Sequence, residues 1–301
     1  MIKTHQVTKK FGDFRAVSAL SCEIPKGCIY GLIGSNGAGK STFLRLATGV
    51  YKADEGSITL DGQDIYENPA AKGRIAYIPD DLYFLAGASM NRMASLYRSI
   101  HRNFDKHRFQ ELTNLFRLNP KTNLNTFSKG MRRQAATILA LCCSPDYIFF
   151  DETFDGLDPV VRNLVKNLIT EDVMERGTTI IITSHSLREL EDTCDQLALL
   201  HKGGIVFESD VQNLKTSLFK VQIAFLDPYS REIFSELDLL NYSQRGSVAN
   251  FIVRGDREQT RALLEEKSPV LLDILPLSLE EVFIHEMQAI GYAFDSILGE
   301  E

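Results

Sequence analysis

The sequence predicts an α/β fold in two parts, and three observations support this prediction. A glycine-rich loop separates the apolar run Ile29–Ile33 from a segment of helical character that begins after Gly39, which makes a strand, loop and helix unit. Two further short apolar runs, Tyr147–Phe150 and Thr179–Thr183, are typical of strands buried on both faces of a parallel sheet. Near residue 210 the pattern starts afresh with a new order of strands and helices.

The composition excludes several classes of protein. The chain has 301 residues, of which 44% are hydrophobic, enough to fill the cores of globular domains. Its formal net charge of −7 argues against a nucleic-acid partner, because phosphate backbones are bound by faces rich in lysine and arginine. The sequence has neither a membrane-spanning run nor a secretory signal, so we expect a cytoplasmic protein. Its five cysteines lack paired spacing, which predicts reduced, buried thiols.

The first predicted part covers residues 1–213. Short β-rich runs occupy Ile2–Val7, Cys28–Ile33 and Ser57–Leu60. Between Leu82 and Ala140 the apolar residues recur at spacings of three and four, which predicts a helical insertion over about residues 82–145. A helix around Val160–Val173 separates the two apolar strands, and a β-like pair closes this part near residue 210.

The second predicted part, residues 214–301, is a small α+β domain. A strand at Val221 is followed by a helix-like stretch, two strand-like runs flanking Gly246, the helix Asp256–Glu266, a strand near Val270–Leu275 and a last helix from Ser278. This order corresponds to a βαββαβ unit. Nothing in it names a ligand, so a regulatory and a dimerising role are both open.

The strongest motif of the chain follows the strand that ends at Ile33. Its members are Gly34, Ser35, Asn36, Gly37, Ala38, Gly39, Lys40, Ser41 and Thr42. They fit the P-loop pattern, in which glycines let backbone N–H groups converge on phosphate oxygens. Lys40 would supply a cation for the β and γ phosphates, and the Ser41 hydroxyl would ligate Mg²⁺. The preceding strand and following helix favour this interpretation over an incidental glycine-rich turn.

Two adjacent carboxylates follow the apolar strand that ends at Phe150. Asp151 and Glu152 come at its C-terminal end, where ligands bind in open α/β sheets. We expect Asp151 to hold Mg²⁺, directly or through water, and Glu152 to orient or deprotonate the attacking water. Such a pair often only caps a strand, but its combination with a P-loop indicates a catalytic role.

Two other segments decide which kind of P-loop protein this is. Ser128 and Gly130 precede a predicted helix, at whose N-terminus they would form an anion site. His185 follows the second apolar strand, from which it would reach the γ phosphate. A lone serine-glycine turn is usually a cap and a lone histidine is usually structural. The spacing to the carboxylates favours the functional interpretation of both.

With these motifs, residues 1 to about 210 resemble the nucleotide-binding domain of ABC transporters. The family's signature motif corresponds to Phe127–Met131, and its D-loop to Gly156–Pro159, which contains Asp158. The resemblance implies that His185 is the switch histidine and that Phe11 stacks on adenine with Val17 alongside. From the residues alone, a core role for Phe11 is nearly as well supported.

The resemblance also implies architecture, activity and partners. The fold would be a P-loop NTPase core with a mostly parallel sheet, an antiparallel β subdomain and the helical insertion. The chain would hydrolyse ATP with Mg²⁺, with Glu152 and His185 catalytic and Ser128, Gly130 and Asp158 contacting nucleotide. One P-loop and one signature per chain imply a head-to-tail dimer with itself or a homologous ATPase subunit. Integral-membrane permease subunits would hold this dimer at the inner face of the cell membrane.

Two positions depart from the family pattern. Asp80 stands where the Q-loop glutamine is usual, and Met131 replaces the last glutamine of the signature. We expect Asp80 to offer an oxygen to Mg²⁺, although its charge adds to that of Asp81 and of the phosphates. An ordinary turn residue after Pro79 is the alternative. Hydrolysis is still expected, because the other catalytic positions are present.

Several alternatives remain open. The segment Leu277–His285 resembles the ending of ABC-2-type exporter ATPases, which favours export, and it also fits a helix capped by Ser278 and Glu281. A soluble ABC-type ATPase acting on ribosomes or DNA is disfavoured by the single nucleotide-binding domain and the acidity. A regulator that hydrolyses ATP poorly is motivated by Asp80 and Met131. A P-loop kinase would not need the signature, D-loop and switch residues.

Overall fold

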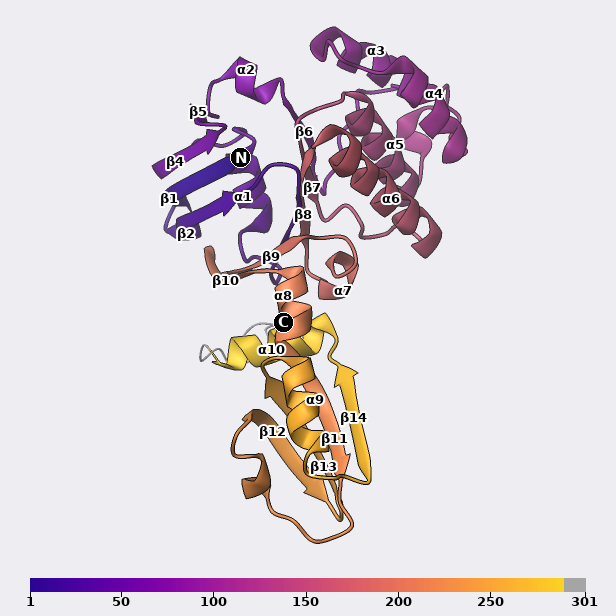
Figure 1. Ribbon diagram of the computed structural model, residues 1–301. Coiled ribbons are helices and arrows are strands. Elements are labelled where there is room, and N and C mark those ends of the chain that lie inside the picture. The colour runs from indigo at the N-terminus through magenta and orange to yellow at the C-terminus, as the bar shows by residue number, and fades with distance from the viewer. Residues whose placement is uncertain (290–301) are drawn as a thin grey trace. The chain divides into compact units, whose positions relative to one another are not determined.

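The computed structural model describes residues 1–289 and divides into two units (Figure 1). The first is Met1–Glu208, and the second begins at Ser209. The division falls inside β10 (Gly204–Asp210), a few residues before the expected start of the second domain at 214. Within residues 1–289, none of the helices has the length and apolar character needed to cross a membrane.

The first unit is organised around a six-stranded, mostly parallel sheet, as predicted. Its middle strands are β3 (Ile29–Ile33), β8 (Thr179–Ser184) and β7 (Tyr147–Asp151), which are neighbours and parallel. All of their residues are buried, because other layers cover both faces. β6 (Ile75–Ile78) follows β7, while β9 (Gln196–His201) and β10 lie beyond β3. The segments that follow the three middle strands therefore leave the sheet at one edge.

A second, antiparallel sheet lies against one face of the first (Figure 1). Its strands, in the order β2-β1-β4-β5, are β2 (Phe14–Ile24), β1 (Ile2–Phe11), β4 (Glu55–Leu60) and β5 (Gln63–Asp64). This is the predicted antiparallel subdomain, although sequence inspection missed β2. In β2 the burial alternates only towards its end, because its first residues are exposed.

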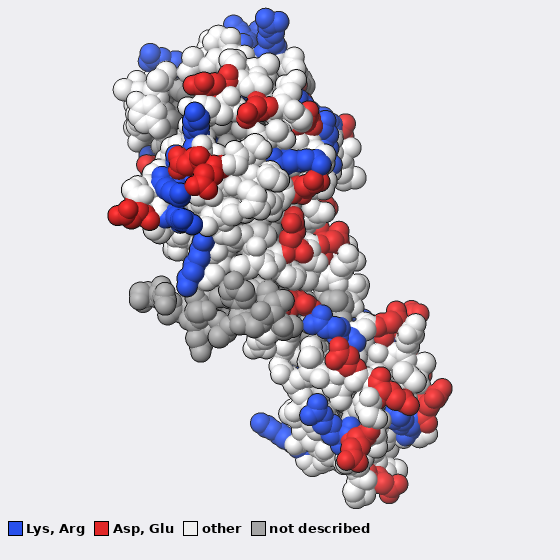
Figure 2. Space-filling model, turned by 90° about the vertical axis from the view of Figure 1, so that its left-hand side faces the viewer, with Lys and Arg blue, Asp and Glu red and all other residues white. Residues whose placement is uncertain are grey.

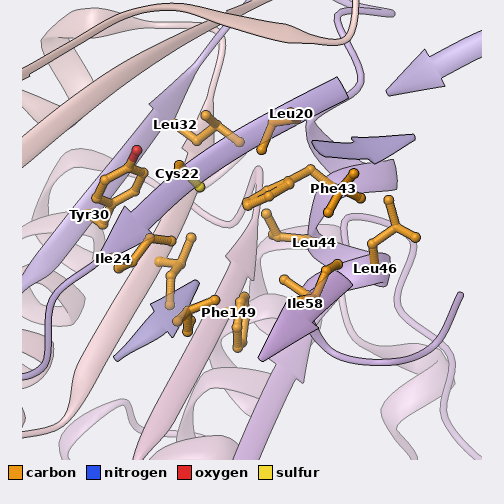
Figure 3. Packing of buried hydrophobic residues seen from close by; sticks show 14 of the residues in the cluster. Leu20, Cys22, Ile24, Tyr30, Leu32, Phe43, Leu44, Leu46, Ile58 and Phe149 are labelled. Atoms are coloured by element: carbon orange, nitrogen blue, oxygen red, sulfur yellow. The ribbon is translucent and has the colours of Figure 1, made fainter. Parts of the chain in front are cut away.

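A hydrophobic core fills the space between the two sheets (Figure 3). Helix α1 (Lys40–Ala47) contributes Phe43, Leu44 and Leu46 to it. These residues meet Leu32 of β3 and Ile58 of β4 in the same cluster. Because α1 follows the P-loop directly, this core fixes the helix at whose N-terminus the loop lies.

The helical insertion is present where the sequence predicted it. It contains α3 (Met90–Ile100), α4 (Lys106–Leu115), a 3-10 turn η1 (Leu124–Thr126) and α5 (Lys129–Cys142). Helix α5 and the following α6 (Pro159–Arg176) lie on the face of the parallel sheet opposite α1 (Figure 1). The short helices α2 (Pro69–Lys72) and α7 (Leu187–Leu190) complete the first unit.

The second unit contains an antiparallel sheet in the order β12-β13-β11-β14. Its elements are α8 (Val211–Ser217), β11 (Leu218–Ala224), η2 (Arg231–Phe234), β12 (Asp238–Arg245), β13 (Val248–Arg254), α9 (Arg257–Glu265), β14 (Leu271–Pro276) and α10 (Leu279–Ala289). The predicted capping box is present, since Ser278 N–H donates to Glu281 Oε2 at 2.9 Å and Glu281 N–H to Ser278 Oγ at 3.3 Å.

The second unit differs from the predicted βαββαβ order at one element. The first helix is only the single 3-10 turn η2. The connection from β11 contains Asp227 and Pro228, and proline disfavours helical conformation at the residue before it. Phe234 at the end of the turn is buried against Phe251, with ring centroids 4.8 Å apart, so the chain must enter β12 soon afterwards.

The described surface carries both signs of charge (Figure 2), and the described cysteines are buried. Figure 2 shows lysine and arginine interspersed with aspartate and glutamate over the face it displays. Opposite charges pair across the antiparallel sheet, for example Lys9 with Asp54 at 2.9 Å. All five cysteines are buried and unpaired, as predicted, and burial raises the pKa of the Cys142 and Cys143 thiols to about 12.

Candidate active site

The P-loop connects β3 to α1 at the carboxyl edge of the parallel sheet. Glycine is required at two of its positions. A Cβ atom at Gly34 would lie 2.5 Å from the carbonyl oxygen of Leu200. At Gly39 the backbone has a φ of +108°, and a Cβ atom would lie 2.3 Å from the carbonyl oxygen of Ala16. The loop therefore fits tightly between its neighbours and presents the N-terminus of α1, an end that favours anions.

Lys40 lies inside this loop with its ammonium group fully partnered. Its Nζ donates to the carbonyl oxygens of Gly34 at 2.6 Å and Ser35 at 3.1 Å. It also lies 3.0 Å from Glu152 Oε1. The buried cation thus joins the P-loop to the loop that follows β7.

Asp151 lies next to Ser41, as the sequence predicted. Its Oδ1 accepts hydrogen bonds from Ser41 Oγ at 3.0 Å and Thr183 Oγ1 at 2.8 Å, and its Oδ2 accepts from Tyr77 OH at 3.2 Å. Burial raises the pKa of Asp151, and these hydrogen bonds oppose the rise. The donor set of a carboxylate and a hydroxyl is composed of oxygen atoms only, which is the chemistry that Mg²⁺ prefers. The residues present therefore fit this ion.

Sequence reasoning missed Thr183 and Tyr77. Thr183 pairs in register with Asp151 across the parallel strands β8 and β7. A polar residue at the end of an apolar strand was the signal that could have found it. Tyr77 stands one strand further along, on β6, and nothing in its local sequence distinguishes it from a core residue.

The Glu152 carboxylate lies between a cation and a histidine. Its Oε2 is 3.0 Å from His185 Nδ1, and its Oε1 contacts Lys40. Its backbone N–H donates to Thr183 Oγ1 at 3.1 Å, and its φ is +48°, in the left-handed region. The sequence-predicted pair of Glu152 and His185 is thus brought together by adjacent strands. A carboxylate held in this way can orient a water and accept a proton from it.

Ser128, Gly130 and Asp158 lie at helix starts. Ser128 caps α5 by accepting from Met131 N–H at 3.2 Å. Asp158 caps α6 by accepting from the N–H groups of Val160 and Val161, both at 3.0 Å. Among residues 1–289, no hydrogen bond or ion pair joins these three residues to the P-loop of the same chain.

The two residues expected beside adenine lie in different environments. Phe11 is 47% exposed and packs edge-on against Tyr51, with ring centroids 5.6 Å apart. Val17, in contrast, has an exposure of 0% and belongs to the core between the sheets. Packing in β2 directs the Val17 side chain inward, and its place alongside a base stays a prediction.

Asp80 does not join the other two expected metal ligands. Its Oδ1 accepts from Arg133 Nη2, whose guanidinium is buried, and no described hydrogen bond links Asp80 to Ser41 or Asp151. The physical reason is that a buried cation requires an anionic partner. In this structure Asp80 is the ion-pair partner of Arg133, and its role as a metal ligand stays a prediction.

Comparison with known proteins agrees with this geometry. Residues 17–155 match the ABC transporter family model. Over 284 residues the chain is 32% identical to the ABC transporter ATP-binding protein YtrB of Bacillus subtilis, covering 94% of this chain and 97% of that protein. This chain belongs to the ATP-binding proteins of ABC transporters. It is accordingly an ABC ATPase, which binds and hydrolyses ATP.

Two other proteins are informative about this ABC ATPase. The Nod factor export ATP-binding protein I of Rhizobium etli is 31% identical over 292 residues, covering 92% of this chain and 90% of that protein. A solved dimeric ATP-binding cassette in a post-hydrolysis state, bound to ADP and phosphate, has the same fold with a TM-score of 0.63. The two sequences are 20% identical, and the matched region spans 70% of this chain and 99% of the cassette.

Proposed function

We propose that this ABC ATPase powers an exporter by hydrolysing Mg-ATP between two chains, with Glu152 as the general base. The observation that carries the proposal is the Glu152 carboxylate between Lys40 and His185, at the edge where the P-loop ends. Export is supported by the ending Leu277–His285 and by the similarity to a Nod factor export protein.

The proposed chemistry divides the site among a few residues. The P-loop N–H groups and Lys40 would bind the phosphates of ATP, and Ser41 and Asp151 would hold Mg²⁺. When bound, this ion neutralises charge on the β and γ phosphates. Glu152 would orient the attacking water and take its proton, while His185 would hold the Glu152 carboxylate and reach the γ phosphate. Phe11 would stack on adenine from the antiparallel sheet.

A second chain is needed in this proposal. In the described part of the chain, no hydrogen bond or ion pair joins Ser128, Gly130 or Asp158 to the P-loop, and each chain carries one set of both motifs. In a head-to-tail dimer, with itself or with a homologous ATPase subunit, they would cover the ATP bound to the other chain. The helix N-terminus at Ser128 suits a phosphate group. The dimeric form of a cassette with the same fold supports this arrangement.

The permease would bind the helical insertion at the inner face of the cell membrane. A groove between β6, α3 and α5 has several aromatic and apolar side chains in its lining, among them Tyr77, Pro79, Leu82, Tyr83, Phe84 and Tyr97. Tyr83 is 83% exposed and forms part of the lining of this groove. We propose that a cytoplasmic helix of an integral-membrane subunit docks in this groove.

The test is Mg-ATP hydrolysis by the purified chain over a range of protein concentrations. Specific activity should rise with concentration and fall by about 10²-fold or more in Glu152→Gln. Glu23→Gln, at an exposed glutamate paired with Lys3, is the matched control and should keep full activity. Binding of ATP without turnover at any concentration would favour the poorly hydrolysing regulator or an obligatory partner subunit. Adding the membrane subunits would separate these two.

A further inference from the structure

We propose that Arg133 positions Glu152 and that Asp80 acts on hydrolysis by holding Arg133. The inference rests on the proposed role of Glu152 as the base. Arg133 lies on α5 and is the largest fully buried side chain among the described residues, with an exposure of 1%. Its guanidinium meets acceptors from two other segments, the loop after β6 and the loop after β7.

The contacts of Arg133 end on the backbone of Glu152. Nη1 donates to the carbonyl oxygens of Glu152 and Asp155, and Nη2 donates to Asp80 Oδ1. Thr183 Oγ1 accepts from the N–H of Glu152 at 3.1 Å. The peptide groups on both sides of the Glu152 Cα atom are therefore held by side chains from different elements.

This restraint matters because Glu152 has a backbone conformation that ordinary residues seldom adopt. A φ of +48° costs free energy for a residue with a Cβ atom, so surrounding contacts must maintain it. In this conformation the carboxylate reaches both Lys40 and His185 at 3.0 Å. Releasing the Glu152 carbonyl would let the backbone relax and move the carboxylate away from them.

Asp80 supplies the anion that a buried arginine needs. Asp80 is half exposed, whereas the Arg133 side chain is almost completely buried. The carboxylate of Asp155 is 3.8 Å from Arg133 Nη2 and is itself paired with Lys129 at 3.0 Å. Without Asp80, the guanidinium would keep two carbonyl acceptors but lose its main countercharge. Asp80, Arg133 and the Glu152 carbonyl thus form a continuous link from the loop after β6 to the proposed base.

The test is a double-mutant cycle with Asp80→Asn, Arg133→Gln and the double variant. Each single variant should lower kcat on the order of tenfold to a hundredfold, because a small displacement of a catalytic group has this effect. The KM for ATP should stay within about twofold, since the P-loop is untouched. The double variant should be no slower than Arg133→Gln alone, because both changes break the same link. In all three variants, the Mg²⁺ concentration that gives half-maximal hydrolysis should equal that of the wild type. Asp80→Glu keeps the charge and should restore most of the activity.

A structural measurement makes the inference independent of turnover. Amide hydrogen exchange over residues 152–157 should accelerate in Arg133→Gln and in Asp80→Asn. If the wild type does not hydrolyse ATP, the proposed function fails. The amide exchange rates of residues 152–157 would still decide whether Arg133 holds the loop after β7. If Arg133→Gln does not fold, Asp80→Asn and its rescue by Asp80→Glu carry the test alone.

The matched control is a second buried ion pair in the same unit. Arg108 Nη2 lies 2.6 Å from Asp172 Oδ1, and Asp172 is buried, but this pair joins α4 to α6 away from the P-loop. Arg108→Gln and Asp172→Asn should lower the Tm and leave kcat unchanged.

Additive losses from Asp80→Asn and Arg133→Gln, or a raised Mg²⁺ requirement in Asp80→Asn, would overturn the inference and favour direct metal ligation. Unchanged exchange over residues 152–157 would overturn it as well.

Discussion

The two units of the chain have hydrophobic cores of the same kind but differ in their buried polar groups. In the first unit, Lys40, Arg133, Asp151 and Thr183 are all buried, and all four take part in the network around the Glu152 loop. In the described part of the second unit, Thr260 is the one buried polar side chain. Burying a charged group is costly, and buried charged groups are enriched at functional sites. The difference agrees with catalysis in the first unit, and we propose a regulatory or dimerising role for the second.

Removal of Lys40 should have the largest effect on the first unit. Lys40→Ala takes away the phosphate-binding cation and also the partner of Glu152 Oε1. We expect hydrolysis to fall by on the order of 10³-fold, because electrostatic stabilisation of the phosphoryl group is lost. Steady-state assays and a fluorescent ATP analogue would measure the loss. Lys3→Ala, which removes an exposed surface ion pair, is the control. Near-normal turnover in Lys40→Ala would contradict the placement of catalysis in the first unit.

In the second unit, a core truncation should affect stability and not chemistry. Phe234 is completely buried and packs on Phe251, Tyr229 and Tyr242. Phe234→Ala should reduce the free energy of unfolding of this unit by about 3–5 kcal/mol. Chemical denaturation would measure this, and kcat per folded chain should be unchanged. A parallel fall in kcat would mean that the second unit takes part in hydrolysis.

Phe11 should matter for nucleotide affinity by an intermediate amount. Phe11→Ala should weaken the binding free energy of ATP by about 1–3 kcal/mol, the range measured for stacking between a base and an aromatic ring, and should raise the Kd accordingly. Phe14→Ala is the control, because Phe14 is also exposed and lies just across the same hairpin. Equal effects of the two variants on the Kd would show that Phe11 has no special contact with the base.

The smallest effect expected is a pH dependence of stability. Burial tends to raise the pKa of Asp61, but hydrogen bonds from Lys26, the α-ammonium group of Met1, Arg74 and Tyr147 outweigh it and hold that pKa well below its ordinary value of 3.8. Because the folded-state pKa is depressed, this stabilisation is present above pH 3.8 and is lost as the pH falls below it.

Asp61→Asn should remove about 1 kcal/mol of stability at neutral pH and flatten the acid limb of the stability curve. In the second unit, hydrogen bonds from Ser278 lower the pKa of Glu281, and no other described residue donates a hydrogen bond that lowers it. Glu281→Gln should therefore flatten the dependence of stability on pH less than Asp61→Asn does. Urea unfolding at a series of pH values from 7 down to about 2 would compare the variants. A larger change for Glu281→Gln would contradict the ranking.

Much of the site could be predicted because it depends on short-range spacing. The P-loop, the carboxylates after β7 and the histidine after β8 follow strands that are recognisable as apolar runs. Adjacent parallel strands then bring Lys40, Glu152 and His185 together without further information.

The residues that could not be predicted depend on packing between distant segments. The pairing of Asp80 with Arg133 joins positions far apart in the sequence, and only the burial of Arg133 shows that it needs an anion. Val17 was assigned to a nucleotide contact by family resemblance, yet its burial depends on the inward face of β2. The domain organisation of residues 214–301 followed from periodicity, whereas the reduction of one helix to η2 depends on the burial of Phe234.

The most direct test of the central claim, that each ATP site is shared by two chains, is a mixing experiment with two inactive variants. Lys40→Ala disables the P-loop, and Ser128→Arg blocks the helix N-terminus at the start of α5. A mixed head-to-tail dimer would contain one site with both elements intact. We predict that each variant alone hydrolyses little Mg-ATP and that mixing them restores activity well above either. Activity that stays at the level of the separate variants, under conditions where wild type turns over ATP, would contradict the shared site.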